Sequence, residues 1–233
     1  MRRGLDRTTI KAIYDRVAGR YDLQHGLLTG WADQRGRRFL VGRAVTAGDR
    51  VLDAGAGTGA TALTAARKVG PEGQVVLFDL SRAMLAVARK KAMRLGLTDR
   101  MEFCAGDILN LPFADEAFDV VLSTYSLCPV FDPARGAREL YRLVKRGGLL
   151  GVAHSGEPAH PAVRRMADRL ERLVWKFPLI SLGCRAVSVL PQLVEDGAEL
   201  LCHHSIGMPL WPFEVFVVRK PSLASGRRAG MAP

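Results

Sequence analysis

The segment Val51-Leu52-Asp53-Ala54-Gly55-Ala56-Gly57-Thr58-Gly59-Ala60 decides how this chain is expected to fold. A short apolar run enters three glycines at alternate positions, and a helical pattern begins at about Thr61. Glycine lets a backbone turn tightly and approach a ligand where a Cβ atom would clash. The start of a helix offers free N–H groups and the positive end of the helix dipole. We therefore expect a buried strand, a ligand-binding turn and a helix in direct succession.

Outward from this segment, short apolar runs alternate with helical patterns along most of the chain. Such alternation predicts an α/β, doubly wound, Rossmann-like domain whose seven-stranded, mainly parallel sheet is covered on both faces. The connection between the last two runs is too short for a covering helix, so these strands are predicted to form a hairpin. The expected strands are residues 50–54, 74–79, 101–105, 118–124, 148–154, 199–206 and 214–219, and the expected helices are 61–69, 81–95, 134–145, 161–177 and 188–195.

The segment before the first strand, residues 5–43, reads as helical with a break at Gly19. Because ligands of open α/β sheets bind at the carboxyl edge of the strands, this segment is predicted to cover that edge. We expect three regions: an N-terminal helical lid over 1–45, a ligand-binding domain over 46–220 and a basic flexible tail over 221–233.

The composition narrows the class of protein. The four cysteines are scattered without a CxxC pair, so a disulfide scaffold or a zinc site is not expected and a reducing cytoplasm fits best. No apolar run approaches the roughly 18 residues of a membrane-spanning helix, and no secretory signal is visible. The formal net charge of +11 favours anionic partners. No basic stripe rich in aromatic residues accompanies it, so no nucleic acid partner is expected.

The glycine pattern by itself leaves two enzyme classes open. Gly55, Gly57 and Ala60 match the dinucleotide-binding pattern GxGxxG/A, and Asp79 follows about 20 residues later, as in nicotinamide oxidoreductases. Asp53, directly before the turn, suits a ligand that carries an ammonium and a sulfonium better than one that carries a pyrophosphate. Asp107 follows the third strand and places a further acid at the same edge.

Further motifs separate these classes by resemblance. The glycine segment resembles motif I of the class I S-adenosylmethionine-dependent methyltransferases, and later segments match that family's motifs in order. The N-terminal segment is similar to that of the ubiquinone/menaquinone biosynthesis (UbiE-like) methyltransferases. The resemblance covers about residues 10–155 and implies S-adenosylmethionine as cofactor and methyl transfer as reaction. The matching segments are residues 14–22, 51–60, 75–85, 106–107, 111–121 and 138–148.

The resemblance also implies roles for individual residues. The glycine turn would approach the methionyl part of the cofactor with Asp53 near its ammonium, and Asp79 would bind the ribose hydroxyls. Leu80 and Met84 would border the adenine, and Asp107 with Ile108 would read its amine. The full set of expected cofactor contacts is Tyr21, Asp53, Gly55, Ala56, Gly57, Gly59, Asp79, Leu80, Met84, Asp107, Ile108 and Ser123.

The acceptor is expected to be small and lipophilic, with a quinone-type ring favoured, a phospholipid amine next and a thiol third. Residues 125–130 read Tyr-Ser-Leu-Cys-Pro-Val, where quinone methyltransferases generally carry Gly-Leu-Arg-Asn-Val. This departure leaves all three acceptors open. Methyl transfer from a sulfonium depends mainly on holding the reacting groups in line, and a base helps only where the acceptor must lose a proton.

Two residues are the expected catalytic candidates: Tyr125 to orient the acceptor, and His154, at the end of the fifth strand, as a base. His25 is expected at the surface and Cys128 in the core. The adjacent His203 and His204 should face opposite sides of a strand, so no metal site is predicted.

Basic helical stretches suggest one further partner. Positive charge beside apolar side chains suits docking on an anionic membrane, here the inner face, from which a lipophilic acceptor could be collected. The basic positions are Arg35, Arg37, Arg38, Arg164, Arg165, Arg169 and Arg172, with apolar Val174, Trp175, Phe177 and Leu179 nearby.

Overall fold

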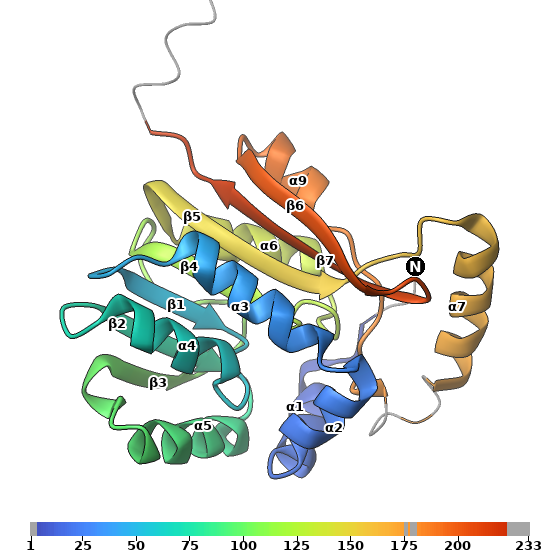
Figure 1. Ribbon diagram of the computed structural model, residues 1–233, viewed down its shortest axis with the longest axis horizontal. Coiled ribbons are helices and arrows are strands. Elements are labelled where there is room, and N and C mark those ends of the chain that lie inside the picture. Colours follow the sequence, from blue (N-terminus) through green and yellow to red (C-terminus); the bar gives the residue numbers. More distant parts are fainter. Residues whose placement is uncertain (1–3, 175–176, 178–180, 223–233) are drawn as a thin grey trace, which may run out of the picture.

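The computed structural model describes residues 4–174, 177 and 181–222, which form a seven-stranded sheet with helices on both faces (Figure 1). The strand order is β3-β2-β1-β4-β5-β7-β6, and β7 runs antiparallel to the other six strands. The predicted doubly wound sheet and its terminal hairpin are therefore confirmed. The strands are β1 (Arg50–Ala54), β2 (Gln74–Asp79), β3 (Met101–Ala105), β4 (Phe118–Thr124), β5 (Val144–Ser155), β6 (Glu199–Met208) and β7 (Trp211–Arg219).

Helices cover the sheet because successive strand residues point to opposite faces. In β1, Val51 joins the core beneath α3, α4 and α5, whereas Leu52 joins the core beneath α6 and α9. Central strands buried on both faces read as continuous apolar runs, which is why they were visible in the sequence. The helices are α1 (Arg7–Val17), α2 (Tyr21–Thr29), α3 (Ala32–Ala44), α4 (Ala60–Val69), α5 (Arg82–Arg94), the 3₁₀ turn η1 (Thr98–Arg100), α6 (Pro133–Arg142), α7 (Pro161–Val174) and α9 (Leu190–Glu195).

The fifth strand begins earlier than predicted. The helix expected over 134–145 ends at Arg142, and β5 begins at Val144 rather than at residue 148. Val144 pairs with Phe118, and a register shift follows before Val120 pairs with Leu149. Gly147, with φ +79°, lies in this irregular stretch. A bulge of this kind inserts extra residues into a strand and interrupts its alternating pattern, so the early start of β5 is not visible in the sequence.

The N-terminal helices divide into two groups. The apolar side chains of α3, including Leu40 and Val41, are buried in the same core as Val215 and Val217 of β7. This helix is part of the layer that covers the sheet. Of the three N-terminal helices, α1 and α2 lie beyond the carboxyl ends of the strands (Figure 1), so the lid expected over residues 1–45 stays a prediction that concerns these two helices.

Polar contacts hold α1 and α2 against the loops that follow β1 and β2 and against α5. Ser81 donates to Asp15 of α1 at 2.5 Å, and Thr58 donates to Asp22 of α2 at 2.5 Å. Lys91 of α5 also contacts Asp22 at 2.5 Å. These contacts place α1 and α2 beside the glycine turn.

Two sequence expectations concern other parts of the chain. From residue 223 onward, the predicted basic tail lies outside the described residues. Among the helices that the structure describes, none has the length and apolar character needed to span a bilayer.

Candidate active site

The glycine turn after β1 has the backbone geometry that only glycine adopts without strain. Gly55, Gly57 and Gly59 have φ values of +72°, +55° and +83°. A Cβ atom on Gly55 would lie 2.1 Å from the Cβ of Ser126, whereas one on Gly57 would meet nothing within 4 Å. Position 55 therefore requires glycine because the Ser126 side chain packs against it, whereas Gly57 faces open space. The helix α4 begins directly behind them at Ala60 and directs its N-terminus at that space.

Asp79, at the end of β2, is fixed to this turn. The Gly57 N–H donates to its Oδ2 at 2.8 Å, and the Ser81 N–H donates to its Oδ1 at 2.8 Å. Burial raises the pKa of this carboxyl to about 6, although both N–H groups favour its ionised form. Each oxygen keeps acceptor capacity for a second hydrogen bond, so Asp79 can receive two neighbouring hydroxyl groups of a ligand.

Asp53 lies behind the turn and not on a cavity wall. It is fully buried, and neither carboxylate oxygen has a hydrogen-bond partner. Burial raises its pKa to about 7, although the positive charge of Arg37 and the nearby Ala62 N–H favour the ionised form. A positive ligand group in front of the turn would act on this carboxylate through the intervening backbone, without direct contact.

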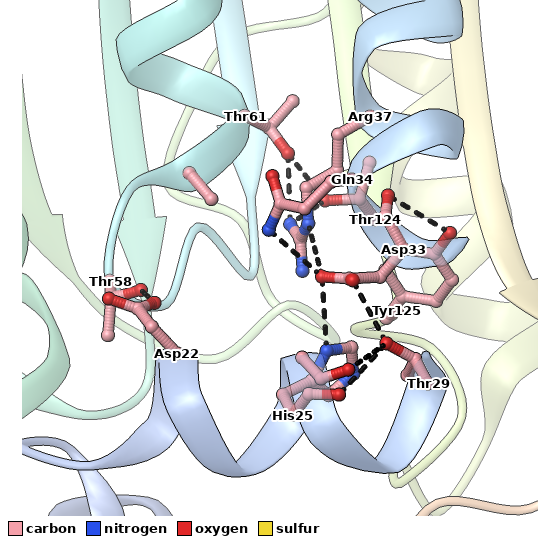
Figure 2. A network of polar contacts seen from close by, with 12 residues as sticks. Asp22, His25, Thr29, Asp33, Gln34, Arg37, Thr58, Thr61, Thr124 and Tyr125 are labelled. Atoms are coloured by element: carbon pink, nitrogen blue, oxygen red, sulfur yellow. Dashed lines mark hydrogen bonds and ion pairs between the residues drawn. The ribbon is translucent and has the colours of Figure 1, made fainter. Parts of the chain in front are cut away.

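A buried polar network joins α2 and α3 to the sheet (Figure 2). The Arg37 Nη1 donates to Thr61 at 3.0 Å and to Thr124 at 2.7 Å, while its Nε lies 3.5 Å from Asp33. The Nδ1 of His25 lies 3.2 Å from the same Asp33 oxygen. Burial would raise the pKa of Asp33, but the hydrogen bond from His25 and the charge of Arg37 outweigh it and hold that pKa well below its usual range. Asp33 is therefore an ionised, fully partnered carboxylate.

Two sequence expectations about this network are wrong. His25 was expected at the surface and Arg37 in a basic stretch suited to docking on a membrane, yet both are buried, at 7% and 5% exposure. The spacing Asp33 to Arg37, one turn apart on a helix, was the available signal for an ion pair. The direction of that helix face toward β4 depends on tertiary packing and could not be read from the spacing.

A cavity opens in front of the glycine turn, and we call it the glycine-loop cavity. It is bounded by the turn, the ends of β2 and β3, and α1 and α2. Arg37, His25 and Ser126 also line it, and none of these was among the predicted contacts. The predicted residues that line it are Tyr21, Gly55, Ala56, Gly57, Asp79, Leu80, Met84, Asp107, Ile108 and Tyr125.

A second cavity of about 290 Å³ adjoins the first, and we call it the apolar cavity. His25 and Tyr125 line both cavities and form the boundary between them. Tyr125 has φ +60° and donates from its hydroxyl to the Asp33 carbonyl at 3.4 Å. The remaining wall is mostly aliphatic and aromatic and includes Leu28, Leu170, Leu182, Cys184, Met208, Leu210, Trp211 and Phe213.

Other predicted residues lie outside both cavities. Ser123 is buried behind Ser126, with 2.6 Å between their hydroxyl oxygens, and Gly59 forms the N-cap of α4. His154 is 2% exposed, its Nδ1 lies 3.1 Å from the Ser155 carbonyl, and burial lowers its pKa. The structure therefore does not bring His154 to the cavity at which it was predicted to act as a base.

Two further predictions from sequence agree with the geometry. Cys128 is fully buried, as expected of a core residue. His203 contacts Glu214 at 2.5 Å, while the ring of His204 packs against Phe39 with 4.9 Å between centroids. The two histidines thus point to opposite faces of β6, so they do not converge on one ion.

The sheet order, the glycine turn and the acids at successive strand ends define a class I methyltransferase fold. A family described as "Methyltransferase domain" matches residues 45–205. The chain therefore belongs to this methyltransferase family. S-adenosylmethionine, predicted from the motifs, is the cofactor of such proteins, and the oxidoreductase alternative is not supported.

Comparison with individual proteins agrees with this assignment. The chain is 35% identical over 160 residues to the ubiquinone/menaquinone biosynthesis C-methyltransferase UbiE of Hahella chejuensis, covering 68% of this chain and 64% of the relative. It thus spans less than two thirds of that relative's length.

Solved structures share the fold at lower identity. The [4+2]-cyclase SpnF is 22% identical with a TM-score of 0.66, covering 90% of this chain and 97% of that one. An arsenic(III) S-adenosylmethionine methyltransferase from Chlamydomonas reinhardtii is 25% identical with a TM-score of 0.56, covering 78% and 66%. Since one of these neighbours is a cyclase, likeness of fold alone does not fix the reaction.

Proposed function

We propose that this protein transfers the methyl group of S-adenosylmethionine to a ring carbon of a small, lipophilic, quinone-type acceptor in its reduced, hydroxylated form. The observation that carries the proposal is the pair of adjoining cavities. One is built around the glycine turn and Asp79, and the other is apolar, with His25 and Tyr125 between them. The identity to UbiE C-methyltransferases supports the same acceptor.

Features of this chain fit the cofactor. The open space at Gly57 leaves room for a ligand against the backbone, and the two Asp79 oxygens suit the ribose hydroxyls. The buried, unpartnered carboxyl of Asp53 suits the nearby positive charge of the ammonium. When bound, the cofactor supplies a methyl group on a positively charged sulfur, which leaves as a neutral thioether.

Arg37 is proposed to bind the carboxylate of the methionyl part. Its guanidinium lines the glycine-loop cavity and is held in place by Thr61 and Thr124. A guanidinium that is buried and preoriented forms strong hydrogen bonds to a carboxylate. Replacing Arg37 with Met should weaken binding of S-adenosylhomocysteine by at least about tenfold in calorimetry, since a hydrogen bond to a charged group contributes about 1.5–3 kcal/mol. Unchanged affinity would place the carboxylate elsewhere.

The apolar cavity favours a ring over the alternative acceptors. Among the described residues that line it there is no Asp or Glu, so it offers no carboxylate for the ammonium form of a phospholipid amine. Its aromatic and aliphatic walls suit a neutral ring. Incubation with labelled methyl donor and a panel of a demethylated hydroquinone, phosphatidylethanolamine and an alkyl thiol tests the choice. We expect label in the hydroquinone alone; label in either other acceptor would overturn the assignment.

We propose that α7 docks the protein on an anionic membrane. Met166, Leu170 and Leu173 are exposed at helical spacing on α7, and we call them the α7 stripe. Phe177, beyond the end of this helix, is also exposed. Exposed Arg164, Arg165, Arg169 and Arg172 accompany them, and Leu170 also lines the apolar cavity. A membrane-bound acceptor would therefore enter from the stripe. Trp175, Leu179 and the side chain of Val174, which were also predicted to contribute, lie outside the description.

Vesicle sedimentation tests this docking. We expect the protein to sediment with vesicles of phosphatidylcholine and phosphatidylglycerol at physiological salt, and Leu173→Glu to reduce the bound fraction several-fold. Met93→Glu is the matched control, because Met93 is 65% exposed but lies on α5. Equal recovery in the supernatant with and without vesicles would contradict the proposal.

A further inference from the structure

His25 occupies a position that the sequence did not assign to the chemistry. Its ring lines both the glycine-loop cavity and the apolar cavity. It stacks on Tyr21, with 5.2 Å between centroids, and lies 5.7 Å from the ring of Tyr125. The side chain is 7% exposed. Because His25 lines both cavities and is buried, its imidazole lies beside any group that reaches from one cavity into the other.

Asp33 fixes the orientation of this imidazole (Figure 2). Its Oδ2 lies 3.2 Å from the His25 Nδ1, and its Oδ1 accepts from Thr29 at 3.0 Å. Because the pKa of Asp33 is held low, its carboxylate is ionised and can only accept. The Nδ1 atom must therefore carry the proton, which leaves the lone pair of a neutral imidazole on Nε2. No described residue forms a hydrogen bond with that Nε2.

The charges around His25 favour its use as a base. Arg37 and Asp33, both on α3, form a buried pair that is neutral overall. Tyr21 on α2 and Tyr125 after β4 stay protonated, because burial raises the pKa of each. The contact with Cys128 and burial raise the pKa of the Cys184 thiol on the wall of the apolar cavity, so this thiol also stays protonated. A proton that reaches Nε2 would be stabilised mainly by Asp33, which directly contacts the ring.

We propose that His25 is the general base of the reaction and that Asp33 is its positioning residue. This inference rests on the proposed function and narrows the acceptor to one with an ionisable ring hydroxyl. The Nε2 atom takes the hydroxyl proton, and the electron pair of the O–H bond stays on the acceptor oxygen. The resulting anion raises the electron density at the adjacent ring carbon. Once the ring carbon carries the methyl group, it loses its hydrogen as a proton and the acceptor oxygen takes up a proton, which restores the ring hydroxyl. One proton is released to solvent overall, so His25 is regenerated as the neutral imidazole.

A phenolic probe tests the base without relying on turnover. The protein is saturated with S-adenosylhomocysteine, and 4-nitrophenol, whose phenolate absorbs in the visible, is titrated with pH. The acidity constant of the bound probe should be at least about tenfold higher in the wild-type complex than in the His25→Gln complex. The reason is that Gln can donate a hydrogen bond to the probe but cannot take its proton. Equal ionisation in the two complexes would overturn the role of His25.

Kinetics supply the second readout. His25→Gln should lower kcat for a hydroquinone by about 10²–10⁴-fold and abolish the acidic limb of the pH profile, with S-adenosylhomocysteine affinity changed less than about threefold. Asp33→Asn should lower kcat less and shift that limb. His203→Gln, at an exposed histidine paired with Glu214, should match the wild type. Unaltered kcat and pH profile in His25→Gln would refute the base.

Two outcomes separate this inference from the proposed function. If the wild-type protein does not methylate the demethylated hydroquinone, the proposed acceptor is overturned. The probe titration would still report on His25. If His25→Gln fails to fold, His25→Ala with added imidazole replaces it. Recovery of probe ionisation by imidazole would support the base, and no recovery in a folded variant that binds S-adenosylhomocysteine would overturn it.

Discussion

Replacing Asp53 with Asn removes a buried carboxyl group whose two oxygens have no hydrogen-bond partner. Burial raises its pKa from 3.8 to about 7 in the folded protein. Between these values the folded state holds a proton that the unfolded chain has lost. The stability linked to this proton is therefore fully present below about pH 4 and is lost as the pH rises through 7. The full shift corresponds to about 4 kcal/mol, at 1.36 kcal/mol for each pKa unit.

This linkage gives a difference that can be measured by urea unfolding at several pH values. Asn keeps the size of the side chain and cannot ionise. The stability gained by Asp53→Asn over the wild type should therefore be about 3 kcal/mol larger at pH 8 than at pH 5. Burial raises the pKa of Asp79 in both proteins, so that contribution cancels, and only the charge repulsion between Asp53 and Asp79 is lost in the variant. Asp99→Asn, at an exposed acid, should show no such change. A stability difference that is the same at both pH values would refute the buried, proton-bearing carboxyl.

Further predictions concern the glycine turn and Asp79. Gly55→Ala should lower the free energy of unfolding by about 3 kcal/mol or more, because its Cβ would lie 2.1 Å from that of Ser126 at φ +72°. Gly57→Ala, at φ +55° with nothing within 4 Å, should cost only about 1–2 kcal/mol of strain in the same urea titration; equal costs would contradict the packing argument. Asp79→Asn should weaken S-adenosylhomocysteine binding by about 1.5–3 kcal/mol in calorimetry, and unchanged affinity would mean that the ribose binds elsewhere.

The sheet and the cofactor wall could be predicted because they depend on local patterns. Buried parallel strands are short apolar runs, and parallel strands bring their carboxyl ends to one edge. Asp79 is the last residue of β2 and Asp107 lies two residues after β3, so their place on the cavity wall follows from the direction of these strands. The glycine turn could be predicted as well, because the positive φ values at Gly55, Gly57 and Gly59 favour glycine at these positions.

The polar network could not be predicted, because its burial is decided by how α3 packs. A run with Arg35, Arg37 and Arg38 looks like a solvated helix face, yet only Arg37 is buried while the other two are exposed. Gly36, whose Cβ would lie 2.5 Å from the Tyr125 hydroxyl, lets that ring approach the helix. His154 shows the converse error: its strand ends at the correct edge, but the alternation of side chains along β5 directs it away from both cavities.

Tyr125 shows how the fold holds the boundary between the two cavities. A non-glycine residue at φ +60° is strained by about 1–3 kcal/mol, so the surrounding contacts must compensate. Its N–H donates to the Ala153 carbonyl at 2.7 Å, and its ring meets Phe213 edge-on with 5.1 Å between centroids. The chain thus maintains a strained turn to keep this ring beside His25. The strained backbone of Tyr125 and the position of its ring at the boundary of the two cavities are therefore maintained by the same contacts.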